Sequence, residues 1–336
     1  MTPVISVCIA NYNGIGLIDD CIESIHAQDA NLPVEIIVHD DASTDGSAAH
    51  IRTHYPNVIL LESEANVGFC IANNRMATVA QGVYLLLLNN DAALLPDALR
   101  TLHNEATRIA RPAILGLPQF DFDSGKIIDR GCLLDPFFNP VPNLNVEQQD
   151  VAMTIGACLW VTRNLWGKLG GFPEWFGSIG EDLYLCCRAR LAGYPVRACA
   201  ESGYRHHVGT SFGGGKAKAD RLSTTYRRRA LSERNKTFAM FACHPRPLFA
   251  LLVPLHLVLI YLEGALLTMI KWNGMLWREI YAPILPSMWR ERDNLRQARS
   301  TTQAQRNSSL ASWLALFRWL PWKLHMLIRH GLPEVK

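Results

Sequence analysis

Apolar segments of strand length alternate with helical segments over the first third of the chain. Strand-like runs rich in β-branched and leucine side chains begin at residues 5, 34, 58, 83 and 113. Between the first two runs, apolar side chains recur with a helical period at Leu17, Ile18, Cys21, Ile22 and Ile25. Strands that alternate with helices are typical of a right-handed, mainly parallel sheet covered by helices. The pattern therefore predicts an α/β fold, followed by irregular loops after about residue 118.

Polar side chains end two of these runs abruptly. VEIIVHDD ends in Asp40 and Asp41, and VYLLLLNND ends in Asn89, Asn90 and Asp91. The carboxyl ends of strands in an α/β sheet open into the crevice where ligands bind. Carboxylate and amide oxygens there favour a hard cation and a phosphorylated ligand. The alternative is a polar turn that caps the next helix.

Two common nucleotide-binding motifs are missing from the sequence. No G-x-G-x-x-G follows the first strand and no Walker A sequence is present. Ordinary dinucleotide and P-loop nucleotide binding are therefore both disfavoured. A nucleotidyltransferase would need a basic, glycine-rich loop after the first strand, and ANYNGIG supplies neither Lys nor Arg.

Residues 247–270 form a 24-residue apolar stretch interrupted by Pro254, His256 and Glu263. The stretch is long enough to span a bilayer. A single span would carry the basic tail to the side opposite the rest of the chain, against the positive-inside tendency. We therefore expect an in-plane or re-entrant helix.

The tail is basic and rich in tryptophan, although the net charge of the 336-residue chain is only +3. Residues 271–336 contain eleven Lys+Arg against four Asp+Glu, and six of the nine tryptophans. This combination is typical of a segment at an anionic membrane surface. A soluble helical domain or a dimer interface is the alternative.

Nine cysteines are scattered without any C-x-x-C pair, which is typical of reduced thiols in a cytosolic protein. The sequence MTPVISVCIANYN lacks a basic region followed by a long apolar core, so no signal peptide is expected.

A series of motifs gives the chain a family resemblance over roughly residues 3–240. In order, they are IANYNG, VHDDASTDGS, NVGFCIANNR, LLLLNNDAAL, GACLWVTR, GGFPEWF, GEDLYLCCRARLAGY and HHVGTSF. Together they resemble the inverting glycosyltransferase family 2, and most closely its rhamnosyltransferase-like members of cell-envelope polysaccharide synthesis. The resemblance implies a GT-A fold, which is Rossmann-like, for residues 1–240, and leaves 241–336 as a helical, membrane-associating region.

The resemblance implies transfer of a sugar, with rhamnose suggested by likeness, from a nucleotide diphosphate donor to a lipid-linked or glycan acceptor. It also implies Mg²⁺ or Mn²⁺, a dTDP- or UDP-sugar, and a place on the cytoplasmic face of the inner membrane. No nucleic-acid partner is expected, and a homo-oligomer is compatible with the sequence. The alternatives are a catalytically silent, nucleotide-binding membrane scaffold and a sugar-phosphate nucleotidyltransferase.

Two residues are the metal ligands that the resemblance implies. Asp91 takes the position of the last acid of the family's D-x-D motif, whereas Asn89 replaces the first. An amide is a neutral ligand, so weaker metal affinity is expected. His206 matches a family histidine that completes the metal site or contacts diphosphate, with a structural histidine as the alternative.

The resemblance also implies a nucleotide site. Asp41 would accept the N3–H of uracil or thymine, and Asp40 would orient the loop or contact ribose. Gly68 would permit close backbone approach, and Arg75 would face the diphosphate. The full set implied is Ala10, Asn11, Tyr12, Asp40, Asp41, Asn66, Gly68, Asn73, Arg75, Asn89 and Asn90.

Glu181 and Asp182 precede a predicted helix, and the resemblance implies that both are catalytic residues, with Asp182 matching the family's catalytic base. Repulsion between adjacent acids raises one pKa, although acids at a helix start also complement the helix dipole. Trp175 and Phe176 would line the acceptor site, with core packing as the alternative.

Overall fold

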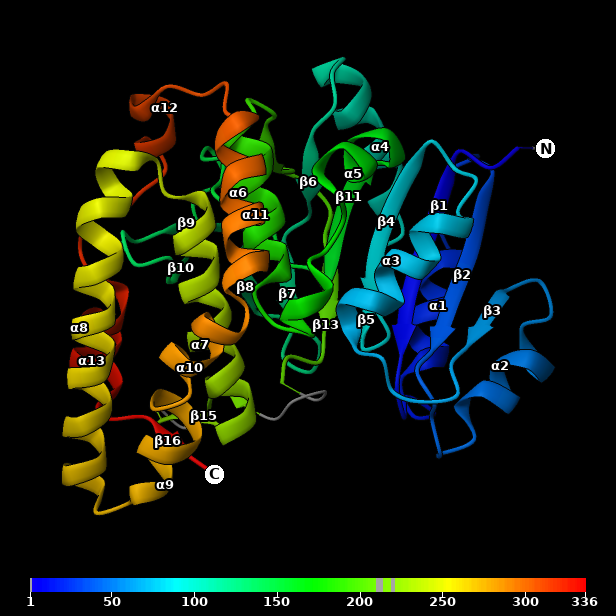
Figure 1. Cartoon of the computed structure of the whole chain (residues 1–336). Coiled ribbons are helices and arrows are strands. Elements are labelled where there is room, and N and C mark those ends of the chain that lie inside the picture. Colours follow the sequence, from blue (N-terminus) through cyan, green and yellow to red (C-terminus); the bar gives the residue numbers. More distant parts are fainter. Residues whose placement is uncertain (1, 210–213, 219–220) are drawn as a thin grey trace. The chain divides into compact units, whose positions relative to one another are not determined.

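The computed structural model describes residues 2–209, 214–218 and 221–336, and the chain divides into two compact units (Figure 1). The first unit comprises Met1–Cys132, Pro142–Ala189 and Tyr194–His207. The second comprises Leu133–Val141, Arg190–Gly193 and Val208–Lys336.

A seven-stranded sheet forms the centre of the first unit. Its order is β12 (Val196–Ala198), β6 (Ile114–Gly116), β11 (Cys158–Thr162), β4 (Tyr84–Asn89), β1 (Ile5–Asn11), β2 (Val34–Asp40) and β3 (Ile59–Glu62). Strand β11 runs antiparallel to β4 and β6, and the other pairs are parallel. The α/β prediction is thus confirmed as a mixed sheet.

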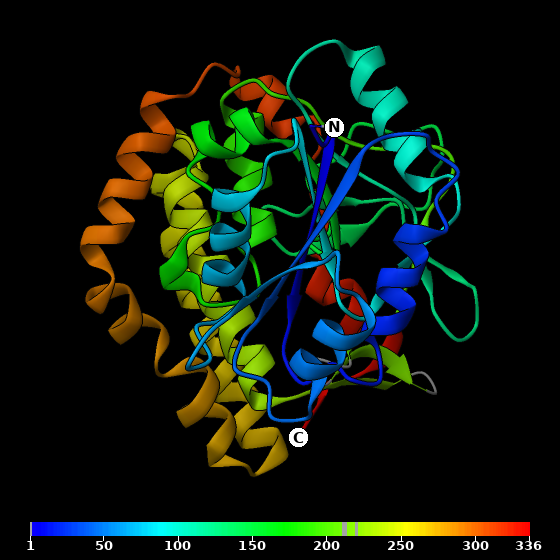
Figure 2. The ribbon, with the colours of Figure 1, turned by 90° about the vertical axis from the view of Figure 1, so that its right-hand side faces the viewer.

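Helices cover both faces of this sheet (Figure 2). They are α1 (Ile18–His26), α2 (Ser47–His54), α3 (Phe69–Val79), α4 (Ala98–Ile109), α5 (Arg163–Leu169) and α6 (Glu181–Leu191). The alternating side chains of Ile5, Val7 and Ile9 join the buried residues of α1 and α4 in one apolar core. Helix α3 packs against β1 and β2.

A second, four-stranded sheet interrupts the expected alternation. It has the order β5 (Ala92–Leu94), β13 (Tyr204–His206), β7 (Gln119–Asp121) and β8 (Ile127–Asp129). The segment AILGLPQF was expected as one strand, but it is divided between β6 in the central sheet and β7 in this one. Pro118 lies at the break, where it lacks a backbone N–H for a ladder.

The register of the central strands brings the predicted polar residues to one edge. Asn11 pairs with Asp40, and Ala10 pairs with both His39 and Asn89. The carboxyl ends of β1, β2 and β4 therefore meet at the same level of the sheet.

The second unit is mainly helical. Its helices are α7 (Tyr226–Cys243), α8 (Arg246–Lys271), α9 (Gly274–Leu276), the π-helix η2 (Trp277–Tyr281), α10 (Ile284–Arg290), α11 (Arg292–Ala304), α12 (Leu310–Leu314) and α13 (Trp322–His330). The strands β14 (Gly214–Lys218), β15 (Arg221–Thr224) and β16 (Glu334–Val335) form its sheet. Strands β9 (Cys132–Leu134) and β10 (Pro140–Pro142) form a separate pair.

The second unit begins earlier in the sequence than the boundary expected at residue 240, which falls inside α7. Helix α7 packs against α8, α10 and α11, so it belongs to the helical unit. The short segment 133–141 belongs there too, because Phe138 packs with Trp313 and Phe317.

Candidate active site

Asn11 holds together the ends of three central strands. Its Nδ2 donates hydrogen bonds to Asp40 Oδ2 at 2.8 Å and to Ser47 Oγ at 3.0 Å. Its Oδ1 accepts a hydrogen bond from Asn90 Nδ2 at 2.9 Å. Asp40 Oδ1 accepts one from the Ser43 N–H at 2.9 Å. These contacts agree with a loop-orienting role for Asp40.

Asp41 holds the loop that precedes α3. Asp41 is 5% exposed, and its carboxylate accepts hydrogen bonds from the N–H groups of Val67 at 2.7 Å and Gly68 at 2.9 Å. Each oxygen keeps a second lone pair, so the predicted contact with a nucleobase is chemically open. Gly68 has φ +89°, and a Cβ there would lie 3.3 Å from the Gly177 carbonyl oxygen. That close approach and backbone conformation both favour glycine.

The other residues of the predicted nucleotide site fall into two groups. Tyr12 is 53% exposed and Asn66 is exposed as well, so both are available to a ligand, while Ala10 is partly exposed at the end of β1. Asn73 is buried, and its Nδ2 donates to the Phe69 carbonyl within α3 at 2.9 Å. Asn73 therefore supports its own helix.

Arg75 extends from α3 toward the end of β2. Its Nη1 donates to Ser63 Oγ at 2.7 Å and lies 3.4 Å from His39 Nε2. Burial lowers the pKa of His39, and the charge of Arg75 acts in the same direction. His39 is then neutral at pH 7, and the Arg75 guanidinium lies against its ring.

Asp91 and His206 meet where β4 and β13 end. Asp91 is 2% exposed, and its Oδ1 lies 3.0 Å from His206 Nε2. Gln119 Nε2 lies 2.9 Å from His206 Nδ1, and Tyr204 OH donates to Gln119 Oε1 at 3.1 Å. With the Gln119 amide donating to Nδ1, the imidazole proton is on Nε2 and faces Asp91.

Gln119 and Tyr204 were not predicted from the sequence. Gln119 lies 87 positions from His206, and only the pairing of β7 with β13 brings them together. Tyr204 had a weak signal, because it lies two residues before His206 on one strand and so shares its face.

The Asp91 carboxylate suits a divalent cation, and so does His206 Nε2 when the imidazole hydrogen is on Nδ1 instead. Two neighbouring ligands of an octahedral ion, each at about 2.1 Å, lie about 3.0 Å apart, which is the separation of Asp91 Oδ1 from His206 Nε2. Asn89 Oδ1 is buried and has no hydrogen-bond partner among the described residues. No group of three or more His, Cys, Asp or Glu is placed to hold a metal within the described ranges. Other ligands would have to come from amides, water or a bound molecule.

Glu181 and Asp182 begin α6 and have different surroundings. Asp182 Oδ2 accepts from the Gly156 N–H at 2.9 Å, and its Oδ1 accepts from the Leu183 N–H at 2.7 Å. Glu181 is 6% exposed, and its Oε2 has no hydrogen-bond partner in the described part of the chain. Burial, with a contribution from the charge of Asp182, raises the pKa of Glu181 to about 8. Glu181 is therefore protonated at pH 7, which leaves Asp182 as the candidate base.

We expect Glu181→Gln to flatten the pH dependence of stability, because glutamine has the shape of protonated glutamate. A raised pKa in the folded state stabilises the protein below the unfolded pKa, and this contribution is lost as pH rises toward 8. The wild-type Tm should therefore fall more between pH 5 and pH 8 than that of the variant. Thermal unfolding at both pH values checks this. Glu64 is exposed, so Glu64→Gln is the control and should leave the pH dependence of Tm unchanged. An equal fall in Tm between pH 5 and pH 8 for wild type and Glu181→Gln would contradict the raised pKa of Glu181.

The two predicted acceptor aromatics differ in exposure. Both belong to the 3-10 helix η1 (Glu174–Phe176). Phe176 has no exposed surface, and its ring packs 4.7 Å from Trp175 and 5.4 Å from Tyr184. Phe176 is therefore a core residue, as the alternative interpretation stated. Trp175 is partly exposed and remains the candidate for an acceptor contact.

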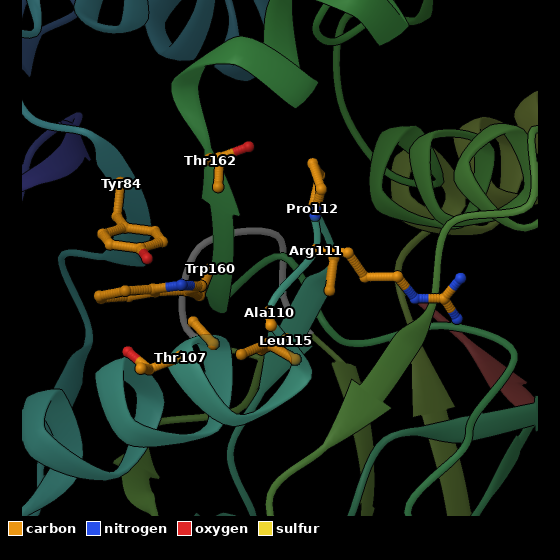
Figure 3. A pocket seen from close by; sticks show the side chains of 10 residues that line it. Tyr84, Thr107, Ala110, Arg111, Pro112, Leu115, Trp160 and Thr162 are labelled. Atoms are coloured by element: carbon orange, nitrogen blue, oxygen red, sulfur yellow. The ribbon is translucent and has the colours of Figure 1, made fainter.

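A cavity of about 340 Å³ lies at the start of β4, whereas the polar residues above lie at its end (Figure 3). Tyr84 stacks on Trp160 there with ring centroids 4.7 Å apart, and Thr107 and Arg111 line the same space. The cavity thus belongs to the opposite edge of the sheet from the candidate site.

Comparisons with known proteins agree on one family. Residues 6–169 match the model of Glycosyl transferase family 2. The chain is 27% identical over 246 residues to the N-acetylglucosaminyl-diphospho-decaprenol L-rhamnosyltransferase of Mycobacterium tuberculosis, which covers 63% of this chain and 79% of that protein. It is 26% identical over 215 residues to the O-antigen chain rhamnosyltransferase WbaN of Salmonella anatum, covering 61% and 66%.

Solved structures share the fold at low sequence identity. TarS of S. aureus, crystallised with UDP, has a TM-score of 0.54 at 15% identity, covering 90% of this chain and 88% of that one. The mannosyltransferase PcManGT of Pyrobaculum calidifontis, in complex with GDP-Man and Mn²⁺, has a TM-score of 0.52 at 19% identity with the same coverage. Residues 6–169 of this chain are therefore a glycosyltransferase family 2 domain, and the chain is a glycosyltransferase.

Proposed function

We propose that this glycosyltransferase moves a sugar from a nucleotide diphosphate donor to a lipid-linked or glycan acceptor in cell-envelope polysaccharide synthesis, with inversion. The observation that carries the proposal is the buried pair of Asp91 and His206, 3.0 Å apart, at the edge where β1, β2 and β4 end. Ligands bind at this edge in α/β sheets, and this pair suits a diphosphate with its cation.

The donor proposed is a dTDP- or UDP-sugar, and rhamnose is the sugar proposed. Two relatives that are named as rhamnosyltransferases support the choice of rhamnose. A carboxylate at position 41 supports a pyrimidine, because it can accept the N3–H of uracil or thymine. Tyr12, exposed beside the same strand ends, offers a ring on which a base can stack.

Mg²⁺ or Mn²⁺ would be held by Asp91 and His206, with the Asn89 amide oxygen as a further candidate ligand. Such an ion, when bound, neutralises the charge that develops on a leaving diphosphate. The residues of the chain position it, and Gln119 holds the His206 ring from behind. Arg75 adds positive charge near the end of β2.

Asp182 would take the proton of the acceptor hydroxyl. As that O–H bond breaks, the oxygen forms a bond to the anomeric carbon, and the bond from this carbon to the diphosphate oxygen breaks on the opposite face. The products are the glycoside with inverted configuration and a nucleoside diphosphate. The Gly156 and Leu183 N–H groups hold both oxygens of Asp182 in place for this step.

The place of action proposed is the cytoplasmic face of the inner membrane, reached through the helical second unit. A decaprenol-linked acceptor appears in the name of one relative, and such a lipid resides in a membrane. Helix α8 is long and apolar enough to cross a bilayer, and about one-third of its most apolar window is buried.

A catalytically silent scaffold is the second candidate function. Asn89 in place of the family's first aspartate favours it, because one carboxylate is lost from the metal site. Donor turnover discriminates between the two functions, since a silent scaffold would bind nucleotide without hydrolysing or transferring the sugar.

The first experiment is a calorimetric titration of UDP, dTDP, GDP and CDP, each with and without Mn²⁺. We expect one pyrimidine diphosphate to bind at least tenfold more tightly with Mn²⁺ than without it. We expect Asp41→Asn to remove the preference for this pyrimidine over the other nucleobases. The control Asp293→Asn changes a carboxylate whose side chain is 78% exposed in the second unit, and it should change nothing. No binding of any diphosphate with any metal would overturn the donor site.

A further inference from the structure

Helix α8, whose ribbon is yellow in Figure 1, has a row of exposed apolar side chains. At 3.6 residues per turn its exposed apolar residues fall within an arc of about 120°. Their exposed fractions range from 40% to 64%, at Leu251, Leu255, Val258, Leu259, Leu262, Leu266, Met269 and Ile270. We call this set the outer face of α8. Glu263 is the only Asp, Glu, Lys or Arg in the stretch 247–270, and it does not belong to the outer face.

The opposite face of α8 packs inside its own unit. Leu252, Val253, Ile260 and Leu267 are at most 8% exposed. A Cβ on Gly264 would lie 2.5 Å from the Tyr281 ring, so glycine lets this ring pack directly on the helix backbone. The helix is therefore anchored along one side over most of its length.

Glu263 and His256 of α8 are paired on the inner side. Glu263 Oε1 accepts from Arg229 Nη2 at 2.6 Å, and Glu263 Oε2 accepts from Lys323 Nζ at 2.8 Å. Lys323 in turn pairs with Glu233 of α7 at 2.5 Å. His256 Nε2 lies 2.8 Å from Oγ1 of Thr237, which also belongs to α7. Helices α7, α8 and α13 are thus linked through partly and fully buried charges.

Exposed tryptophan and basic residues flank the outer face. Arg246 and Lys271, both exposed, are at its two ends, and Trp272 follows with 95% of its surface exposed. Arg278 follows in η2; its side chain is 75% exposed, and its Nε donates to Glu279 Oε1 at 3.0 Å. An uncharged apolar face between basic ends and an exposed indole complements an anionic lipid surface.

We propose that the outer face of α8 inserts into the headgroup–acyl boundary of an anionic membrane leaflet, with the helix axis in the membrane plane. This inference deepens the proposed function, because a lipid-linked acceptor is presented at the same surface. The 26 residues of α8 would lie along about 39 Å of that surface.

A membrane span is inconsistent with the packing of α8. A spanning helix would expose its inner face to lipid or carry its neighbours into the bilayer. Either change would break the Glu263 ion pairs or move their charges into hydrocarbon, and both cost free energy. Insertion of the outer face leaves these contacts unchanged.

Depth-resolved fluorescence quenching tests the orientation. Single cysteines replace Leu251, Val258 or Met269, at the start, middle and end of the outer face, and carry an environment-sensitive dye. The nine native cysteines are buried, so the label is selective in the folded protein. With brominated lipids in phosphatidylglycerol-containing vesicles, we expect the same shallow depth at all three sites. A middle site much deeper than both ends would overturn the in-plane orientation.

A matched pair of variants tests the surface itself. Val258 on the outer face and Val83 in the first unit are both 58% exposed. We expect Val258→Glu to weaken partition onto anionic vesicles at least tenfold, and Val83→Glu to leave it unchanged. Equal partition for both variants, or no vesicle binding by the wild-type chain, would overturn the proposal. So would a change from dimer to monomer in Val258→Glu, since the face would then be covered by a second copy.

Donor binding in the absence of vesicles separates this inference from the proposed function. Val258→Glu should bind the nucleotide diphosphate as the wild type does. If the wild-type chain binds vesicles but no diphosphate, the proposed function fails and the lipid surface stands. If it binds diphosphate but no vesicles, the lipid surface fails and the proposed donor site stands.

Discussion

Replacing Asp182 with asparagine is expected to lower sugar transfer by about 10²–10⁴-fold, while nucleoside diphosphate affinity stays within about twofold of the wild type. The amide keeps the size of the carboxylate but cannot take a proton from an acceptor hydroxyl. Radiolabelled dTDP-rhamnose and UDP-sugars, followed for both transfer to extracted membrane lipid and hydrolysis, give the rate. Calorimetry gives the affinity.

The control for this variant is its neighbour. Glu181→Gln changes an acid that is already protonated at pH 7, so we expect transfer to fall by no more than a few-fold. Asparagine accepts only one of the two backbone hydrogen bonds now received by Asp182, so thermal unfolding must show that Asp182→Asn remains folded. Loss of diphosphate binding in a folded Asp182→Asn protein would contradict its role as base. Equal rate losses in the two variants would contradict the division of roles.

Replacing Asp91 with asparagine is expected to weaken Mn²⁺ affinity at least tenfold and to lower transfer by about 10²–10³-fold. The asparagine oxygen still accepts from His206 Nε2, so the buried contact at 3.0 Å is kept while the negative charge is lost. Electron paramagnetic resonance of free Mn²⁺ measures the affinity without any turnover.

The matched variant for Asp91→Asn acts in the opposite direction. Asn89→Asp restores an acid where the family has the first aspartate of D-x-D, and the Asn89 oxygen is buried without a partner in the described structure. We expect it to raise Mn²⁺ affinity several-fold. If Mn²⁺ affinity is unchanged in both variants, the metal site lies elsewhere.

The polar strand ends could be predicted from the sequence because local patterns determine them. A buried strand that ends in acids points them to a sheet edge, and the parallel register then places Asp40 beside Asn11. The partners behind the site could not be predicted in this way. Gln119 reaches His206 only because the chain breaks at Pro118 and starts a second sheet, and no local period encodes that pairing.

Burial was also out of reach of local reasoning. Trp175 and Phe176 are neighbours with the same chemistry, yet Phe176 is completely buried. The apolar stretch 247–270 did predict helix α8, whereas the cations that satisfy Glu263 come from α7 and α13. Tertiary packing decides which side of a helix is exposed to solvent. The sequence of an 18- to 26-residue segment alone does not predict that side.

The Gln119 amide has a consequence for the imidazole it contacts. Rotation of this amide by half a turn would exchange its NH₂ and its carbonyl oxygen, and the Tyr204 hydroxyl can serve either as donor or as acceptor. With the oxygen toward Nδ1, the ring would carry its hydrogen on that nitrogen and offer a lone pair from Nε2. A side chain that never titrates would thereby select between two tautomers of His206, one that donates toward Asp91 and one that can coordinate.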